Sequence, residues 1–226
     1  MPAKQAPASA TERIAAAITQ AIVERRLMPG TKLAEQKLAD IFKVSRTLVR
    51  QALNQLSRDR LVTLTPARGA FVAEPSVEEA RQVFEVRQML EAAMLARLAR
   101  TITAGQLAEL RAHLRAEREA IARSDVSGRT RLLADFHVLL ARMQGNEVLA
   151  QLLGDLLSRS SLISLMYQSS HSADESQREH AAIVDALARG DAKAALELLE
   201  QHLGNVEANL RLKPRIQDLA EALTTS

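Results

Sequence analysis

Residues 31–73 read TKLAEQKLADIFKVSRTLVRQALNQLSRDRLVTLTPARGAFVA, and this stretch decides the fold of the N-terminal part of the chain. Two short helical patterns meet at Val44-Ser45, and a hairpin pattern with Pro66 and Gly69 as turn residues follows them. A short helix, a tight turn, a second helix and a small wing are typical of a winged helix-turn-helix that reads double-stranded DNA. We therefore expect a DNA-binding unit over residues 11–74.

The second of these helices should present cations to DNA. Ser45 is a good N-cap because its hydroxyl can accept a hydrogen bond from a backbone N–H of the first turn. Arg46 and Arg50 lie one turn apart and face outward with Thr47. The residues expected to pack inward are Leu48, Val49, Ala52, Leu53 and Leu56 from this helix, and Leu33, Leu38, Ala39, Ile41 and Phe42 from the first helix.

Each of these polar residues has a defined use on DNA. An arginine at the start of the helix can donate two hydrogen bonds to a guanine, which discriminates between bases by about 1–3 kcal/mol. Lysines suit phosphates, which position the protein without reading sequence, and Arg68 at the tip of the wing would lie near the backbone or minor groove. Two arginines alone would equally suit a solvated helix face, but the cap, the turn and the wing favour DNA. The lysines are Lys32, Lys37 and Lys43.

The same stretch resembles the GntR family of bacterial transcriptional regulators, from about Ile14 to Val72. By this resemblance the operator-contacting set includes Ser45, Arg46, Thr47, Arg50, Arg68 and Gly69, with Lys32 and Gln36 beside it. Leu48 stands where the family commonly has a proline, which leaves the operator sequence open. The residues that carry the resemblance are Met28 to Leu33, Leu38-Ala39, Val44 to Thr47, Val49-Arg50, Ala52-Leu53 and Arg68 to Val72.

Charge and composition support two units with different partners. Residues 1–75 hold 12 Lys/Arg against 6 Asp/Glu, whereas residues 76–226 hold 18 against 21. The positive charge thus gathers on the expected DNA reader. The chain has no cysteine, which excludes disulfides and thiolate metal sites, and no long apolar run or signal-peptide core, so we expect a cytoplasmic protein with no membrane contact. Residues 1–10 are expected to form a flexible tail.

The second unit, residues 75–226, is expected to be an all-α bundle of six or seven helices. Strand signals are almost absent after Ser76, and Thr103 with Gln106 forms a capping-box pattern. Gly145-Asn146 and Gly190-Asp191 are expected to mark breaks between consecutive helices. The expected helices span 76–100, 103–123, 128–144, 146–168, 173–189, 191–212 and 214–223.

This second unit resembles the effector-binding domain of the FadR subgroup, called FCD, over most of residues 80–210. The resemblance implies a homodimer that binds a small organic acid or related metabolite. The motifs that carry it are Arg87 to Glu91, Phe136-His137, Gly145-Asn146, Glu179-His180 with Gly190-Asp191, and His202-Leu203.

His137, His180 and His202 lie on the inward faces of three different expected helices. Neutral imidazoles are good ligands for zinc or nickel, and the resemblance points to these positions as metal ligands. The family has an aspartate four residues before the first histidine, where this chain has Leu133, and Asp135 faces elsewhere on the helix. Two alternatives follow: the three histidines hold one divalent metal, or the pocket is metal-free and they bond the effector directly. We assign no role to His113 or His171.

Four further residues are candidate effector contacts. Arg87 leans inward and can either pair with Glu91 one turn away or reach an anionic effector. Arg159, Ser164 and Tyr167 place polar groups on an otherwise apolar helix, as does Ser160, although serine hydroxyls also bond back to helix carbonyls.

Together these features predict a ligand-responsive repressor that binds a near-palindromic operator as a homodimer. One rival is a metal-dependent enzyme that uses the three histidines, against which no well-placed carboxylate is apparent as a general base. Another is a helical interaction module with no ligand, which a completely filled bundle core would favour.

Overall fold

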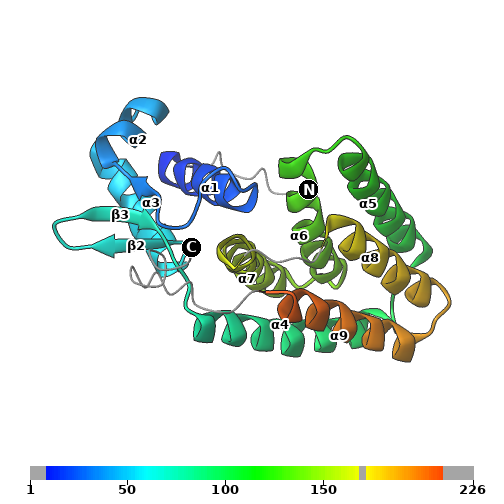
Figure 1. Cartoon of the computed structure of the whole chain (residues 1–226). Helices are drawn as coiled ribbons and strands as arrows, with labels where there is room; N and C mark the ends of the chain where they lie inside the picture. The colour runs from blue at the N-terminus through cyan, green and yellow to red at the C-terminus, as the bar shows by residue number, and fades with distance from the viewer. Residues whose placement is uncertain (1–8, 168–171, 211–226) are drawn as a thin grey trace.

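A computed structural model describes residues 9–167 and 172–210 of the chain. Most of the expected N-terminal tail, the expected helix over 214–223 and His171 lie outside the described residues. The described part forms a winged N-terminal unit and a helical bundle that pack against each other (Figure 1).

The N-terminal unit begins with a helix that the sequence motif did not include. Helix α1 spans Ala10–Val23, and Ser9 caps it in a reciprocal capping box with Glu12. Helices α2, Glu35–Phe42, and α3, Arg46–Arg58, follow it and form the expected helix-turn-helix. Lys43 ends α2 in the left-handed conformation, which turns the chain toward α3.

The wing is an antiparallel sheet of three strands rather than two. Strands β2, Val62–Thr65, and β3, Gly69–Val72, form the expected hairpin. A short strand β1, Lys32–Leu33, pairs with the other edge of β3, so the strand order is β1-β3-β2. The assignment of Leu33 to the first helix was therefore wrong, because the turn at Gly30 sends this segment onto the sheet before α2 begins.

Helix α3 is the centre of the N-terminal core. Val49, Ala52, Leu53 and Leu56 are buried, as expected. Leu48 is only half-buried, and Ile41 of α2 is exposed, which corrects the expectation that both pack inward. Val49 takes the inward place because α3 turns this face toward the buried residues of α1.

Six helices make up the bundle in the part of the chain that the structure describes, close to the expected ranges. Thr103 caps α5 with Gln106 in a capping box, and Asn146 and Asp191 cap α7 and α9 after the expected glycines. The helices are α4 Val77–Leu98, α5 Ala104–Ala122, α6 Val126–Met143, α7 Glu147–Met166, α8 Ala173–Ala188 and α9 Ala192–Ala208.

Helix α7 joins the two units. It packs against α4 and α6 within the bundle and against α1 of the N-terminal unit, and Leu162 belongs to the core around α1 and α3. Figure 1 shows α1 above α7 and beside α6. Among the described helices, α7 alone has the length and apolar composition of a membrane span, but core helices of globular proteins share these properties. We read α7 as a core helix because its inward residues pack in both units.

Candidate functional site

The exposed face of α3 carries the two arginines expected to read DNA. The Arg46 and Arg50 side chains are 59% and 61% exposed, one turn apart at the start of the helix. The Ser45 hydroxyl accepts a hydrogen bond from the backbone N–H of Leu48, which fixes the first turn. The helix therefore begins with a cap and two solvent-facing cations.

A carboxylate that the sequence reasoning missed holds both arginines. Glu35, at the start of α2, lies 2.7 Å from Arg50 Nη2 and 3.3 Å from Arg46 Nη2, and Arg50 Nε donates a second hydrogen bond to it. The hydrogen bond from Arg50 lowers the pKa of Glu35, although burial opposes the shift. No spacing rule links residues 35 and 50, so only the packing of α2 on α3 reveals this pair.

The remaining candidates for DNA contact surround this helix. The wing brings two cations together, since Lys32 and Arg68 each lie over the ring of Phe71, 5.9 and 5.6 Å from its centroid. Gly69 follows the turn with φ of +98°, and a Cβ added there would meet no described atom within 4 Å apart from its chain neighbours, so the tip of the wing is open. Thr47 and Gln36 are exposed, and the Gln36 amide donates to Asp40 on α2.

The three candidate ligand histidines converge inside the bundle. His137 comes from α6, His180 from α8 and His202 from α9, and all three are buried. Their candidate ligand atoms all lie within 4.8 Å of one another. The sequence reasoning thus identified three residues that the structure brings to one place.

Each histidine bonds a carboxylate through Nδ1. Glu91 Oε2 lies 2.5 Å from His137, Glu117 Oε1 lies 3.1 Å from His180, and Glu179 Oε2 lies 2.6 Å from His202. The sequence reasoning expected no well-placed carboxylate as a general base beside the histidines, and it missed these three partners of Nδ1. Glu117 carried a signal that could have shown it, because it continues the apolar face of α5 formed by Leu110 and Leu114.

These carboxylates fix the chemical state of the rings. When Nδ1–H donates to a carboxylate, the Nε2 lone pair is the one that faces a ligand. Nε2 of His180 is buried without a hydrogen-bond partner in the described residues, which is costly unless a ligand satisfies it. The residues therefore fit a metal ion or a hydrogen-bonding ligand at this point.

Burial keeps the histidines neutral. It lowers the pKa of His137 and His180, and it lowers the pKa of His202 to about 4, against the hydrogen bond with Glu179. Burial raises the pKa of Glu91, but Arg87 and His137 outweigh burial and lower the pKa of this carboxyl to about 2. Neutral imidazoles backed by ionised carboxylates are the state in which histidine binds metals.

Arg87 and Glu91 form the expected ion pair one turn apart on α4. Arg87 Nε donates to Glu91 Oε1 at 2.8 Å, and both side chains are buried. Glu91 thus bridges Arg87 and His137. His113, to which we assigned no role, also contacts this network, 3.4 Å from Glu117, and its Nε2 donates to the backbone oxygen of Leu132.

A cavity of about 410 Å³ opens onto the three histidines, and we call it the histidine pocket. Leu133 lies in its wall, so an apolar side chain replaces the family's aspartate at the expected place, whereas Asp135 faces a different groove. Its polar and charged lining is His137, His180, His202, Arg25, Arg87, Arg129, Thr130, Ser160, Ser161, Ser164, Ser172, Asp174 and Ser176.

The structure separates the four candidate effector contacts into two pairs. Arg87 and Ser164 line the histidine pocket. Arg159 and Tyr167 do not: Arg159 Nη2 lies 2.7 Å from Glu79, and the Tyr167 hydroxyl donates to the backbone oxygen of Pro75. Both of the latter tie α7 to the start of α4, a structural use that explains why an apolar helix carries them.

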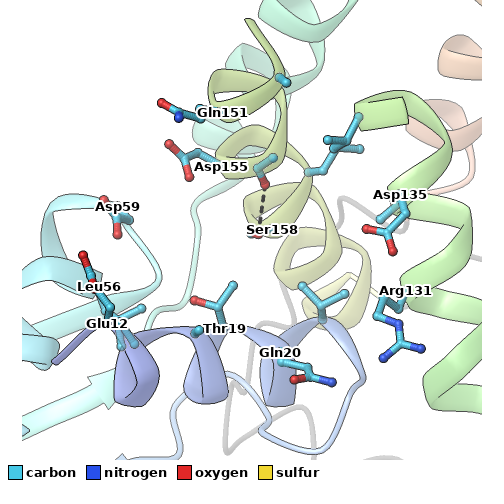
Figure 2. A pocket seen from close by; sticks show the side chains of 18 of the residues that line it. Glu12, Thr19, Gln20, Leu56, Asp59, Arg131, Asp135, Gln151, Asp155 and Ser158 are labelled. Atoms are coloured by element: carbon cyan, nitrogen blue, oxygen red, sulfur yellow. Dashed lines mark hydrogen bonds between the residues drawn. The ribbon is translucent and has the colours of Figure 1, made fainter. Parts of the chain in front are cut away.

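A second hollow of about 650 Å³ lies between α1, α3, α6 and α7, and we call it the interdomain groove (Figure 2). Asp59, at the end of α3, and Asp155, on α7, line the groove on one side. Asp135 and Arg131 lie together on α6. Burial raises the pKa of Asp59, and burial and the charge of Asp59 raise the pKa of Asp155. Two negative charges, Asp59 of the N-terminal unit and Asp155 of the bundle, therefore repel each other at this groove.

Comparison with known proteins matches both units. Residues 10–72 match the model of bacterial regulatory proteins of the gntR family, and residues 82–205 match the FCD domain. The chain is 30% identical over 191 residues to the HTH-type transcriptional repressor RspR of Escherichia coli, with 84% of each chain covered. It is 28% identical over 218 residues to the galactonate operon transcriptional repressor of the same species, with 82% of this chain and 90% of the relative covered.

Solved structures give the same picture. A putative GntR transcriptional regulator from Rhodococcus sp. RHA1 superposes with a TM-score of 0.78 at 28% identity, over 89% of this chain and 97% of that chain. McbR/YncC of Escherichia coli shares the fold with a TM-score of 0.78 at 21% identity, over 89% and 97% of the two chains.

Proposed function

The chain belongs to the GntR family of bacterial transcriptional regulators, with a C-terminal FCD domain, and it is a transcription regulator rather than an enzyme. We propose that it is a cytoplasmic repressor that binds a near-palindromic operator as a homodimer and releases it when a small organic acid enters the histidine pocket. The N-terminal unit, about residues 11–74, would read DNA, and residues 75–226 would bind the effector and dimerise.

The exposed face of α3 supports the DNA-binding half of this proposal. Arg46 and Arg50 project from a capped helix start, the part of such a helix that enters the major groove. Thr47 would contact a thymine methyl or a phosphate beside them, and Ser45 and Gln36 would bond the backbone. Lys32, Arg68 and Gly69 would place the wing on the neighbouring phosphates or minor groove.

The histidine pocket carries the effector-binding half. It joins three neutral imidazoles to the guanidinium of Arg87 in a cavity whose volume suits a metabolite of a few carbon atoms. The existence of this cavity speaks against a ligand-free interaction module. Ser164 would bond an effector hydroxyl, whereas the contacts of Arg159 and Tyr167 favour a structural role for these two.

We infer that the three histidines hold one divalent transition metal, zinc or nickel, through Nε2. Such an ion would act as a Lewis acid toward an oxygen ligand. With Leu133 in place of the aspartate, the protein supplies three ligands and leaves coordination positions for water or an effector carboxylate. The metal-free alternative uses the same atoms as direct hydrogen-bond partners of the effector.

Operator binding in the presence of defined acids tests the proposal. Fluorescence anisotropy on a DNA site selected in vitro would compare hydroxy acids of two to six carbons. At least one should weaken operator binding in the wild type but not in His180→Asn. His113→Asn is the matched control, because His113 also contacts Glu117 but lies outside the histidine pocket. A constant operator affinity with every acid, or the same response in His180→Asn, would contradict the proposal.

A further inference from the structure

The turn after α1 connects the N-terminal unit to the start of α6. The Ser127 hydroxyl of α6 donates to the backbone oxygen of Glu24 at 3.3 Å, and Arg131 Nη1 lies 3.6 Å from the Glu24 carboxylate. Arg26 N–H closes the turn on the carbonyl of Ala21, with Arg25 in the left-handed region at φ of 59°. These contacts hold the backbone at Glu24 and Arg26, on either side of Arg25, and so fix the position from which the Arg25 side chain extends.

Arg25 lines the histidine pocket, although it belongs to the unit that carries α3. Arg129 of α6 lines the same cavity, and within residues 9–167 and 172–210 no carboxylate lies within ion-pair distance of either guanidinium. Burial and the charge of Arg129 lower the pKa of Arg25, and both arginines line one cavity. Two like charges at one cavity wall attract an anion.

The cavity has two chemically different ends. The deep end holds the buried histidines and Arg87, where Nε2 of His180 has no hydrogen-bond partner among the described residues. The outer end holds the exposed Arg25 and the half-buried Arg129. Asp174 is the single acidic lining residue in the described part, against three arginines, and one of these, Arg87, already neutralises Glu91. Serine and threonine hydroxyls also line the cavity.

We propose that the effector is a hydroxy acid with two anionic groups, one held at the histidines and Arg87 and the other between Arg25 and Arg129. This inference rests on the proposed function and names its ligand class. The second anion bridges the two units, because Arg25 belongs to the turn after α1 of the N-terminal unit and Arg129 to α6 of the bundle. The bound acid therefore favours one orientation of the N-terminal unit over others.

A contact with both Arg25 and Arg129 lets the effector bind one orientation of the N-terminal unit more tightly than the others, and control of operator binding requires such a difference. A ligand shifts an equilibrium only if it binds one state better than the other. A monoanionic acid occupies the deep end in every orientation of the N-terminal unit. A dianionic acid gains its second contact only when Arg25 faces Arg129, so dianions control the operator and monoanions of the same skeleton do not.

Two pairs of sugar acids test this on the full-length, metal-loaded protein. D-Gluconate and D-glucarate share one carbon skeleton and differ in the second carboxylate, and D-galactonate and D-galactarate form the second pair. Isothermal titration calorimetry would measure binding, and anisotropy on the selected operator would measure release. Loss of a charge-assisted contact changes affinity by about tenfold or more.

In the wild type, at least one diacid should bind about tenfold or more tightly than its monoacid partner and should alone release the operator. Arg25→Gln should remove this preference while monoacid binding persists, and Arg25→Lys should restore part of it. Arg13→Gln removes an exposed cation from α1, away from the histidine pocket, and should leave the preference unchanged.

Equal binding of diacid and monoacid, or a preference that survives in Arg25→Gln, would overturn the bridge and leave the proposed function standing if either acid releases the operator. Binding of none of the four acids would overturn the ligand class. Loss of the preference in Arg13→Gln as well would show a general charge effect and would also overturn it.

Discussion

At the scale of single residues, carboxylates decide the state of the functional side chains. Glu35 neutralises the two arginines expected to read DNA, and Glu91, Glu117 and Glu179 orient the three histidines. Neither set of partners follows from spacing, because each pair joins different helices. The sequence predicts which cations and imidazoles are functional, but packing determines which acid restrains each of them.

Glu35 is expected to act as a restraint on nonspecific binding. In Glu35→Gln, Arg46 and Arg50 lose their carboxylate and become available to any phosphate. Nonspecific DNA affinity should rise, and the slope of log K against log salt should steepen by about 0.9 for each arginine that turns to a phosphate. Anisotropy with random-sequence DNA over a salt series measures both. Asp40→Asn, on the same helix but bonded to Gln36, is the control. An unchanged slope would contradict this role.

The histidines are expected to hold about one metal per chain. Mass-spectrometric elemental analysis of the untagged protein should find zinc or nickel, and His137→Ala should lose it. Glu179→Gln should retain the ligands but weaken metal affinity by about 10–100-fold, because Glu179 orients His202. Absence of metal after supplementation would favour the metal-free pocket, in which Leu133 has replaced the fourth ligand.

At the scale of elements, capping and periodicity predicted most of the helices. Ser45 and Thr103 cap the helices that the sequence assigned to them, and Asn146 and Asp191, expected only to mark breaks between helices, cap α7 and α9. Strand β1 escaped prediction because two residues carry too little periodicity, and their strand identity comes only from pairing with β3. The histidine cluster was predictable from inward-facing positions, but the participation of Arg25 depends on how one unit docks on the other.

In the interdomain groove, the charge of Asp155 is expected to destabilise the fold, because burial and the charge of Asp59 both disfavour it. The raised pKa of Asp155 means that the folded state favours its protonated form, so its charge destabilises the protein above that pKa. Asp155→Asn should stabilise the protein at pH 7 by roughly 0.2–1 kcal/mol, in keeping with the exposure of Asp155 to solvent. The gain should shrink as the pH falls toward the ordinary carboxyl value of 3.8.

Thermal unfolding of Asp155→Asn across this pH range measures the effect. Asp185→Asn removes an exposed carboxylate from α8, far from the groove in the fold, and serves as the control. An equal change in stability in both variants, or a loss of stability at pH 7 in Asp155→Asn, would show that Asp59 and Asp155 do not repel each other across the groove.

At the scale of the whole molecule, one chain places the helix proposed to read DNA and the histidine pocket on two units that α7 joins. Helix α7 packs in the bundle and contributes Leu162 to the core around α1 and α3. The turn at Glu24 ties α1 to α6 beside the histidine pocket. A shift of the bundle helices on effector binding would therefore move α3 through α1.

The protein is expected to be a homodimer in solution, since a near-palindromic operator needs two symmetric readers. Size-exclusion chromatography with light scattering should give twice the chain mass of 24.8 kDa. The same mass should persist in Arg46→Ala, because this residue lies on the exposed face of α3 that we propose reads DNA. A monomeric mass across the working concentration range would contradict the symmetric arrangement.

The most direct test of the account is selection of random double-stranded DNA by the full-length protein, beside Arg46→Ala. The account predicts one enriched, near-palindromic sequence for the wild type. It also predicts that Arg46→Ala loses discrimination at one symmetric pair of base positions, by about 1–3 kcal/mol at each. Enrichment of no sequence by the wild type, or of the identical sequence with unchanged affinity by Arg46→Ala, would contradict sequence reading by the exposed face of α3.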